Sequence, residues 1–262
     1  FQVMTILSSG FRNPNIDDIG KIRENNGILV VPNTFLKPEY AYNLDLGINY
    51  KSLNELTYLS LRTFATVISR HIVRDDFIIF SDNTTPDEST ILYNGEEVTT
   101  IANKNLGNRF IHGYSIDGFS YFSRSLKLNG SLSYVKGDEN ETYGPMPSIS
   151  PIFGTISGEY TKDKIKISAL YKFSGDKSPK DYSLGGEDGL EETPVITENS
   201  NGIIYAGTPK WSDFSIYTNY DISEDVKIRI ALTNIFDNHY RTFASGISAP
   251  GRSFQIGLYL KL

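Results

Sequence analysis

Apolar and polar residues alternate strictly over the last stretch of the chain, residues 251–262. One parity holds Phe254, Ile256, Leu258, Leu260 and Leu262; the other holds Ser253, Gln255, Gly257, Tyr259 and Lys261. Successive side chains of a β-strand point to opposite faces, so this stretch predicts a strand with one apolar face and one largely polar face.

The same pattern recurs upstream. Between residues 40 and 51, Tyr40, Tyr42, Leu44, Leu46, Ile48 and Tyr50 alternate with Ala41, Asn43, Asp45, Gly47, Asn49 and Lys51. Further strands are predicted over 1–10, 57–70, 108–122, 126–134, 152–162, 165–173, 211–222 and 225–234. The chain therefore contains about ten strands.

The predicted connections alternate between short and long. Short turns fall at 52–55, 123–124, 162–164 and 223–225, whereas long polar segments cover 11–38, 74–102, 137–150, 174–210 and 235–251. Transmembrane barrels combine short periplasmic turns with longer extracellular loops. We therefore expect an all-β, antiparallel transmembrane β-barrel in a bacterial outer membrane. The alternative is a soluble antiparallel β protein whose apolar faces pack on each other.

Composition narrows the possible classes of protein. No segment approaches the ~18 apolar residues of a membrane helix, which excludes a helical membrane protein. The 17 Tyr and 15 Phe suit a barrel with aromatic girdles at the membrane interfaces. The net charge of −6 argues against a nucleic-acid partner.

No catalytic constellation is visible. The chain has no Cys, no Gly-rich phosphate loop and no spaced Ser/His/Asp set. The three histidines, His71, His112 and His239, lack metal-ligand spacing. We therefore predict no catalytic residue, no cofactor and no enzyme; an outer-membrane lipase or protease is the third hypothesis.

Several motifs resemble those of TonB-dependent outer-membrane receptors. The family's Phe-Arg-Ala-Pro and Asn-Pro-x-Leu-Lys-Pro-Glu blocks resemble Phe11–Pro14 and Asn33–Glu39, with Asn13 and Thr34-Phe35 as departures. Its Asn-Leu-Phe-Asp-x-x-Tyr block resembles Asn234–Tyr240, and its closing element resembles Ala249–Arg252 with the terminal strand. Asn103–Gly113 resembles a strand entry, and Tyr182–Asp188 resembles a loop of receptors from Bacteroidetes-type bacteria.

This resemblance implies a whole receptor of about 22 strands with an N-terminal plug and a TonB box. Residues 1–262 would form the C-terminal portion of the barrel, with the plug and earlier strands absent. No signal peptide is visible and the chain opens on Phe1 within a strand, so we expect a fragment or a processed chain. The terminal strand would close the barrel onto its first strand.

The implied function is uptake of a scarce nutrient of the ferric siderophore, haem or cobalamin class. Residues 15–32 lack the histidine that haem receptors often carry there, which disfavours haem. The implied partners are outer-membrane lipid, the remaining N-terminal barrel half and plug, TonB through the plug, and a nutrient ligand such as an iron chelate. The alternative function is a structural or interaction subunit of an outer-membrane complex, docked to a surface lipoprotein.

Candidate substrate-binding residues lie near the predicted loops: Phe11, Arg12, Tyr93, Tyr143, Tyr205 and Arg241. The competing expectation is that the motif arginines, Arg252 included, pair with carboxylates such as Glu39 and Asp237, and that the tyrosines and Trp211 form a girdle. A calcium site is a further prediction, because Glu187, Asp188, Glu191 and Glu192 provide oxygen ligands in one loop; the alternative is a solvated charged loop.

Overall fold

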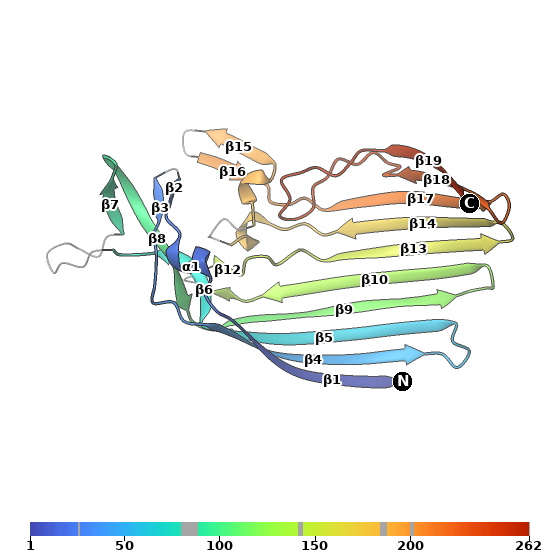
Figure 1. The fold of residues 1–262 in the computed structure, drawn as a ribbon, viewed down its shortest axis with the longest axis horizontal. Coiled ribbons are helices and arrows are strands. Elements are labelled where there is room, and N and C mark those ends of the chain that lie inside the picture. Colours follow the sequence, from blue (N-terminus) through green and yellow to red (C-terminus); the bar gives the residue numbers. More distant parts are fainter. Residues whose placement is uncertain (26, 80–88, 141–143, 184–187, 200–201, 262) are drawn as a thin grey trace. The chain divides into compact units, whose positions relative to one another are not determined.

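The computed structural model describes residues 1–25, 27–79, 89–140, 144–183, 188–199 and 202–261. Its main feature is a ten-stranded sheet with the order β1-β4-β5-β9-β10-β13-β14-β17-β18-β19 (Figure 1). The strands are β1 (Gln2–Arg12), β4 (Glu39–Lys51), β5 (Thr57–Ser69), β9 (Arg109–Tyr121), β10 (Leu126–Gly137), β13 (Phe153–Lys162), β14 (Ile165–Ser174), β17 (Trp211–Asp221), β18 (Val226–Thr233) and β19 (Ser253–Leu260).

The ten predicted strands match these ten, and the all-β prediction is confirmed. Consecutive sheet strands are neighbours, as in an up-and-down meander, and the registers recorded from β10 to β19 are all antiparallel. No helix of the described residues is long and apolar enough to cross a bilayer.

One face of this sheet is a continuous row of exposed apolar side chains. On β4 the six alternating tyrosine, leucine and isoleucine residues are all exposed, and on β19 Phe254, Ile256, Leu258 and Leu260 are each more than half exposed. Leu262 lies outside the described residues. Large apolar side chains on an open face mark contact with lipid or protein, and here they follow every strand rather than one patch.

The opposite face is held by polar pairs between neighbouring strands. Ser131 and Thr155 hydroxyls lie 2.7 Å apart, and Thr66 donates to Asn43 over 2.6 Å. Lys172 forms an ion pair with Asp213 at 3.4 Å. Since such pairs satisfy polar groups beside water, this face fits a wet lumen.

The segments expected as long polar connections, 11–38 and 74–102, contain regular structure that the sequence pattern did not predict. With a few flanking residues they form a five-stranded sheet, β2-β3-β8-β6 with β7 on β8. Its strands are β2 (Arg23–Asn25), β3 (Ile28–Val30), β6 (His71–Asp76), β7 (Thr90–Tyr93) and β8 (Glu96–Leu106). Leu29, Val31, Val98 and Ala102 form its buried core. Burial of these four apolar residues stabilises the sheet, although the two segments are polar in composition.

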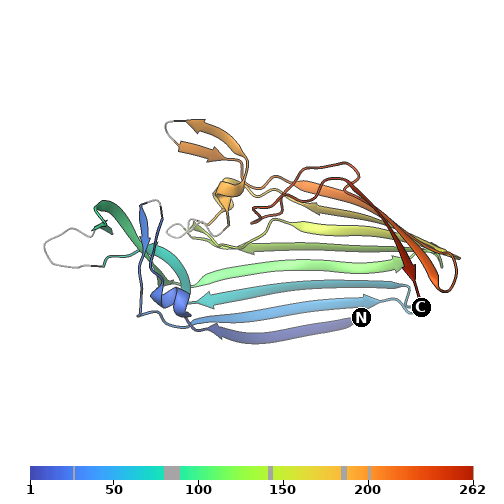
Figure 2. The same ribbon diagram turned by 45° about the horizontal axis from the view of Figure 1, so that its top comes forward.

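The other long connections also contain local structure. Residues 138–152 include β11 (Glu139–Asn140) and β12 (Gly144–Pro145). Residues 175–210 include the 3-10 turns η1 (Pro179–Asp181) and η2 (Leu190–Glu192), and the hairpin of β15 (Val195–Asn199) with β16 (Gly202–Tyr205), which is clear of the ten-stranded sheet in Figure 2.

The chain forms two compact units. One comprises Phe1–Ile6, Asp45–Phe64 and His112–Leu262; the other comprises Leu7–Leu44 and Ala65–Ile111 and includes the five-stranded sheet. The short helix α1 (Ile16–Gly20) belongs to the second unit. Asn15 caps it, accepting from the Asp18 backbone N–H while the Asp18 side chain accepts from the Asn15 N–H.

Candidate functional site

A pocket of about 370 Å³ lies between two long connections, the one from β14 to β17 and the one from β18 to β19. The first supplies Gly189, Glu191, Glu192, Thr193, Pro194, Thr208, Pro209 and Lys210, and the second supplies His239, Tyr240, Arg241, Thr242, Ala244 and Ser245. We call it the loop pocket. It brings Arg241 together with Glu191 and Glu192, three residues that the sequence singled out.

Arg241 spans the loop pocket from one connection to the other. Its guanidinium donates to the Glu192 carbonyl over 2.8 Å and to the Ser248 hydroxyl over 3.3 Å, and lies 3.7 Å from the Glu192 carboxylate. The Arg241 side chain stays 40% exposed, so donors remain open to the pocket. Arg241 therefore both ties the loops and offers positive charge to a ligand.

Tyr240 fastens the second connection to the start of β17. Its ring stacks on Trp211 with centroids 4.3 Å apart, and its hydroxyl donates to Asp213 over 3.0 Å. Burial, and then the hydrogen bond to Asp213, raise the pKa of Tyr240 to about 12. Trp211 thus packs on this tyrosine at the base of the loops.

Asn234 shapes the turn that follows β18. It is buried, has φ +47°, and its amide donates to the carbonyls of Asn238 and Pro250 while accepting from the Asn238 N–H. Nearby, the Asp237 carboxylate accepts from the Arg252 N–H over 2.7 Å and lies 3.8 Å from its guanidinium. Arg252 thus pairs with a carboxylate, as the competing expectation for the motif arginines has it.

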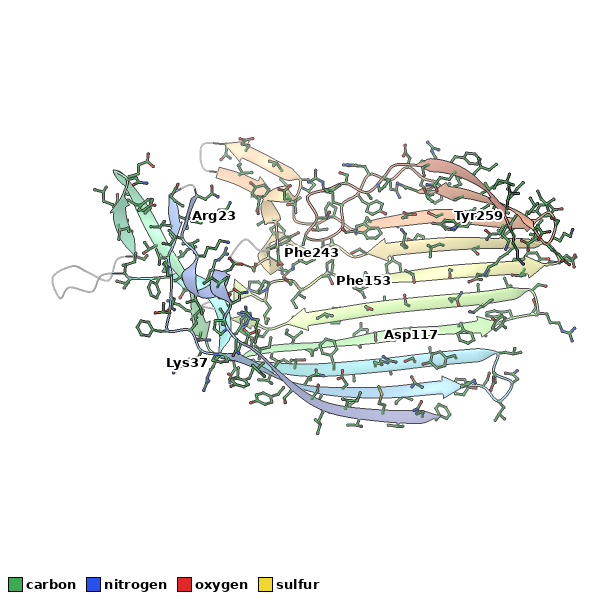
Figure 3. The ribbon with its side chains drawn as sticks, viewed as in Figure 1. Arg23, Lys37, Asp117, Phe153, Phe243 and Tyr259 are labelled. Atoms are coloured by element: carbon green, nitrogen blue, oxygen red, sulfur yellow. The ribbon has the colours of Figure 1, made fainter. Side chains whose placement is uncertain are left out.

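A buried ion pair lies behind the loop pocket. Lys177 and Asp188 are 3.1 Å apart, with side chains 5% and 2% exposed. Lys177 also donates to the Ile149 carbonyl and lies 4.0 Å from the centre of the Phe243 ring, while Asp188 accepts from the Ser148 N–H. Figure 3 shows Phe243 among the long connections. The pair therefore joins three connections.

Burial lowers the pKa of Lys177, and the Asp188 carboxylate opposes that shift. Sequence reasoning missed Lys177, because one lysine in a polar segment looks like any solvated charge. Of its two aromatic partners, Tyr182 lies in the same connection as Lys177, whereas Phe243 belongs to the β18–β19 connection, so only the fold brings Phe243 to Lys177.

The predicted calcium ligands do not converge in the described residues. The cation beside Asp188 is Lys177, and Glu192 lies beside Arg241. No group of three or more His, Asp or Glu side chains suited to a metal ion occurs in the described parts of the chain. Glu187 lies outside them, so the calcium site stays a prediction.

Arg12 belongs to a separate network in the second compact unit. It forms an ion pair with Asp18 at 2.8 Å and lies 3.7 Å from Glu39, whose carboxylate is 2.8 Å from His71 Nδ1. Arg12 therefore pairs with carboxylates, as the competing expectation for the motif arginines has it. Asn103 donates to Asp18, so the network also fixes α1 against β8.

The remaining candidates are dispersed. Phe11 is 68% exposed and its ring lies 6.2 Å from Tyr40, in the apolar row of the sheet. Tyr93 packs on the core of the five-stranded sheet, and Tyr205 is half-buried at the end of β16. Tyr143 lies outside the described residues.

Comparisons with known proteins agree with this architecture. The model of the family "TonB dependent receptor-like, beta-barrel" matches residues 7–235. A probable TonB-dependent siderophore receptor PirA of Acinetobacter baumannii is 20% identical over 239 residues, covering 88% of this chain and 31% of the receptor. The chain thus spans about a third of that relative.

Solved structures share the fold. The crystal structure of PirA superimposes with a TM-score of 0.73 at 17% identity, covering 98% of this chain and 38% of the other. The copper transporter OprC gives 0.68, and a ferric enterobactin receptor mutant (PfeA) of Pseudomonas aeruginosa in complex with enterobactin gives 0.71, both at 17% identity and the same coverage.

The family whose model matches this chain consists of outer-membrane transport proteins without enzymatic activity. Three findings agree. The sheet is antiparallel with one lipid-facing row, its other face carries polar pairs, and the family model covers most of the sequence. The chain belongs to the TonB-dependent receptor family and forms part of its β-barrel.

Proposed function

We propose that this chain supplies barrel wall and extracellular loops to a transporter that takes up a scarce nutrient as an anionic metal chelate of the ferric siderophore class. The observation that carries the proposal is the loop pocket. It lies among the long connections, and Lys210, His239 and Arg241 line it with donors. Haem and cobalamin belong to the same proposal as alternative cargo.

The relatives support this class of cargo. PirA is described as a siderophore receptor, PfeA as a ferric enterobactin receptor, and OprC as a copper transporter. Metal chelates and anions are recognised by fixed donors of the kind that Arg241 and Lys210 present.

The ten strands would form one part of a closed barrel of about 22 strands, with a plug inside it. In the described residues β1 and β19 each have a neighbour on one side only. Hydrocarbon does not tolerate unpaired backbone groups, so both edges need further strands. TonB would act on the plug rather than on these residues, and the resemblance of Tyr182–Asp188 favours a Bacteroidetes-type source.

The test is uptake and binding by the intact receptor that carries this chain. Iron-limited cells producing the receptor are expected to accumulate a radiolabelled ferric catecholate, and Arg241→Gln is expected to weaken its binding to the purified receptor about tenfold. Arg124→Gln, in the short β9–β10 turn, is the matched control. Equal binding by wild type and Arg241→Gln across ferric siderophores, haem and cobalamin would overturn the proposal.

The second candidate is an interaction subunit, favoured by the β15–β16 hairpin. Val195, Ile196, Ile203 and Ile204 of this hairpin are exposed at its surface. A barrel purified with a surface lipoprotein in equal amounts, and without nutrient binding, would support this role instead.

A further inference from the structure

One hydroxyl group joins two of the side chains that line the loop pocket. The Ser248 oxygen lies 2.9 Å from His239 Nε2 and accepts from Arg241 Nε over 3.3 Å. His239 and Arg241 both line the pocket, whereas Ser248 does not. Ser248 therefore contacts the two lining side chains without being part of the pocket wall.

The backbone of the β18–β19 connection brings these residues together. The chain turns at 242–245, where the Ser245 N–H donates to the Thr242 carbonyl over 3.1 Å. After the turn, the Ala249 N–H donates to the Tyr240 carbonyl over 2.8 Å. Because Ala249 is held against Tyr240, the preceding residue, Ser248, lies within reach of both neighbours of Tyr240.

The contacts of Arg241 leave part of its guanidinium open. Nε bonds to Ser248 and Nη1 donates to the Glu192 carbonyl over 2.8 Å, whereas Nη2 has no partner among the described residues. Two bonds to different connections fix the plane of this rigid group, and so they fix the direction of the Nη2 donors. His239 Nδ1 likewise has no partner in the described part of the chain.

We propose that Ser248 is a positioning residue of the loop pocket, which holds Arg241 and His239 as one pair of donors for the anionic oxygens of the transported chelate. This inference rests on the proposed function of the loop pocket, to which it adds the residue that orients the donors. A serine that only stabilised the turn would leave the two side chains independent of each other.

The hydrogen-bonding capacity of the three groups gives each a role. Arginine only donates, so the Ser248 oxygen accepts from Arg241 and its own hydrogen goes to His239 Nε2. The neutral imidazole then carries its proton on Nδ1, the nitrogen that is left for a ligand. Donation from Arg241 also polarises the hydroxyl, which strengthens its bond to His239.

The first test needs no nutrient. The intact receptor in detergent is treated at neutral pH with diethyl pyrocarbonate, which acylates the unprotonated nitrogen of a neutral imidazole, and modification of His239 is followed by mass spectrometry. In wild type this nitrogen accepts the Ser248 hydrogen bond. Ser248→Ala is therefore expected to speed modification of His239 about three- to tenfold, the equivalent of one hydrogen bond.

Two comparisons show whether the hydroxyl itself is responsible. Ser248→Thr keeps a hydroxyl and is expected to restore the wild-type rate of His239 modification. His71 and His112 of the same sample serve as internal references, and their rates are expected to be the same in all variants.

The second test measures binding of the ferric catecholate to the intact receptor. Ser248→Ala is expected to weaken binding about three- to tenfold. In a receptor that already carries Arg241→Gln and His239→Gln, the same change is expected to have no further effect, because the side chains that Ser248 orients are gone. Ser223→Ala, in the short β17–β18 turn, is the matched control and is expected to bind as wild type does.

Two results would overturn the proposal. One is equal modification of His239 in wild type and Ser248→Ala, and the other is an equal loss of catecholate binding on Ser248→Ala in both backgrounds. The proposed function fails in a different way, namely when Arg241→Gln itself leaves the binding of every cargo unchanged. The modification rates are measured without nutrient, so they decide the positioning role of Ser248 in that case as well.

Discussion

Lys177 and Asp188 show how a single pair of residues can organise several loops. Both lie in the β14–β17 connection, and each also bonds to the backbone of the β10–β13 connection. Asp188 directly precedes Gly189 of the loop pocket, and Phe243 lies between its lining residues Thr242 and Ala244. The pair therefore positions the pocket without facing a ligand.

We predict that Lys177→Met in the intact receptor destabilises these loops by about 3–5 kcal/mol, because Asp188 is left buried without a counter-charge. Hydrogen exchange of residues 144–150, 175–183 and 235–251 measures the effect. Lys177→Met combined with Asp188→Leu is expected to recover part of the loss. Exchange unchanged from wild type in the single variant would refute the role of the pair.

The turn at Asn234 yields a second prediction. Asn234→Gly keeps a residue that tolerates φ +47° but removes the amide, so the Asn238 and Pro250 carbonyls lose their donor. We expect a loss of about 1–3 kcal/mol, measured as faster proteolysis within 235–251. Asn54→Gly, in the exposed β4–β5 turn, is the control and is expected to leave that cleavage rate unchanged.

From the raised pKa of Tyr240 we predict that the stability of the receptor depends on pH in the alkaline range. Its folded-state pKa of about 12 lies above the ordinary value of 10.0, so the neutral form is favoured by folding. The stabilisation is complete below pH 10.0 and is lost as the pH rises through about 12. In Tyr240→Phe the unfolding temperature of the intact receptor should fall less steeply across this window than in wild type, whereas Tyr205→Phe should behave as wild type does.

At the scale of the strand, the two faces differ in the solvent that they meet. Ile156 and Ser157 are adjacent on β13; Ile156 is 56% exposed in the apolar row, and Ser157 accepts from Asn129 on the polar face. We predict that Ile156→Lys destabilises the barrel in membranes by about 2–4 kcal/mol, since the charge enters hydrocarbon.

The neighbouring substitution Ser157→Lys serves as the control, because its charge meets water, and we expect a much smaller loss. Urea unfolding of the intact receptor in lipid vesicles measures both. Similar losses in the two variants would mean that the apolar row does not face lipid.

Sequence reasoning succeeded for elements with a local signal. In β4 each residue's face follows from its neighbours two positions away, so the row from Tyr40 to Tyr50 fixes the strand. The five-stranded sheet has no such signal, because β3 is only three residues long and pairs in parallel with β8. Its contacts, such as Asn33 with Asn103, join residues 70 positions apart.

The candidate site also has features that the sequence predicted and features that it did not. Arg241 was found because it follows a recognisable motif, and opposite charges led to the expectation that the motif arginines pair with carboxylates such as Glu39 and Asp237, without saying which arginine pairs with which. The loop pocket itself was not predictable, since its walls come from two connections whose backbone paths depend on buried contacts such as Lys177 with Asp188.

At the scale of the whole molecule, the two edge strands of the sheet need further strands to pair with. β1 and β19 present unpaired backbone groups in the described chain, and a hydrocarbon core leaves these no partner. We predict that residues 1–262 refolded alone in detergent do not form a closed monomer, whereas the intact receptor does. Gel mobility before and after heating distinguishes the two. A heat-resistant monomer of residues 1–262 would contradict this.

The parallel pairing of β3 with β8 has a further consequence. Two connections that leave the sheet at different points share one buried core through Leu29, Val31, Val98 and Ala102. A graft that moved only one of them into another receptor would strip half of that core and expose the rest to water. The two segments must therefore be transplanted, shortened or diversified together, as a single cassette.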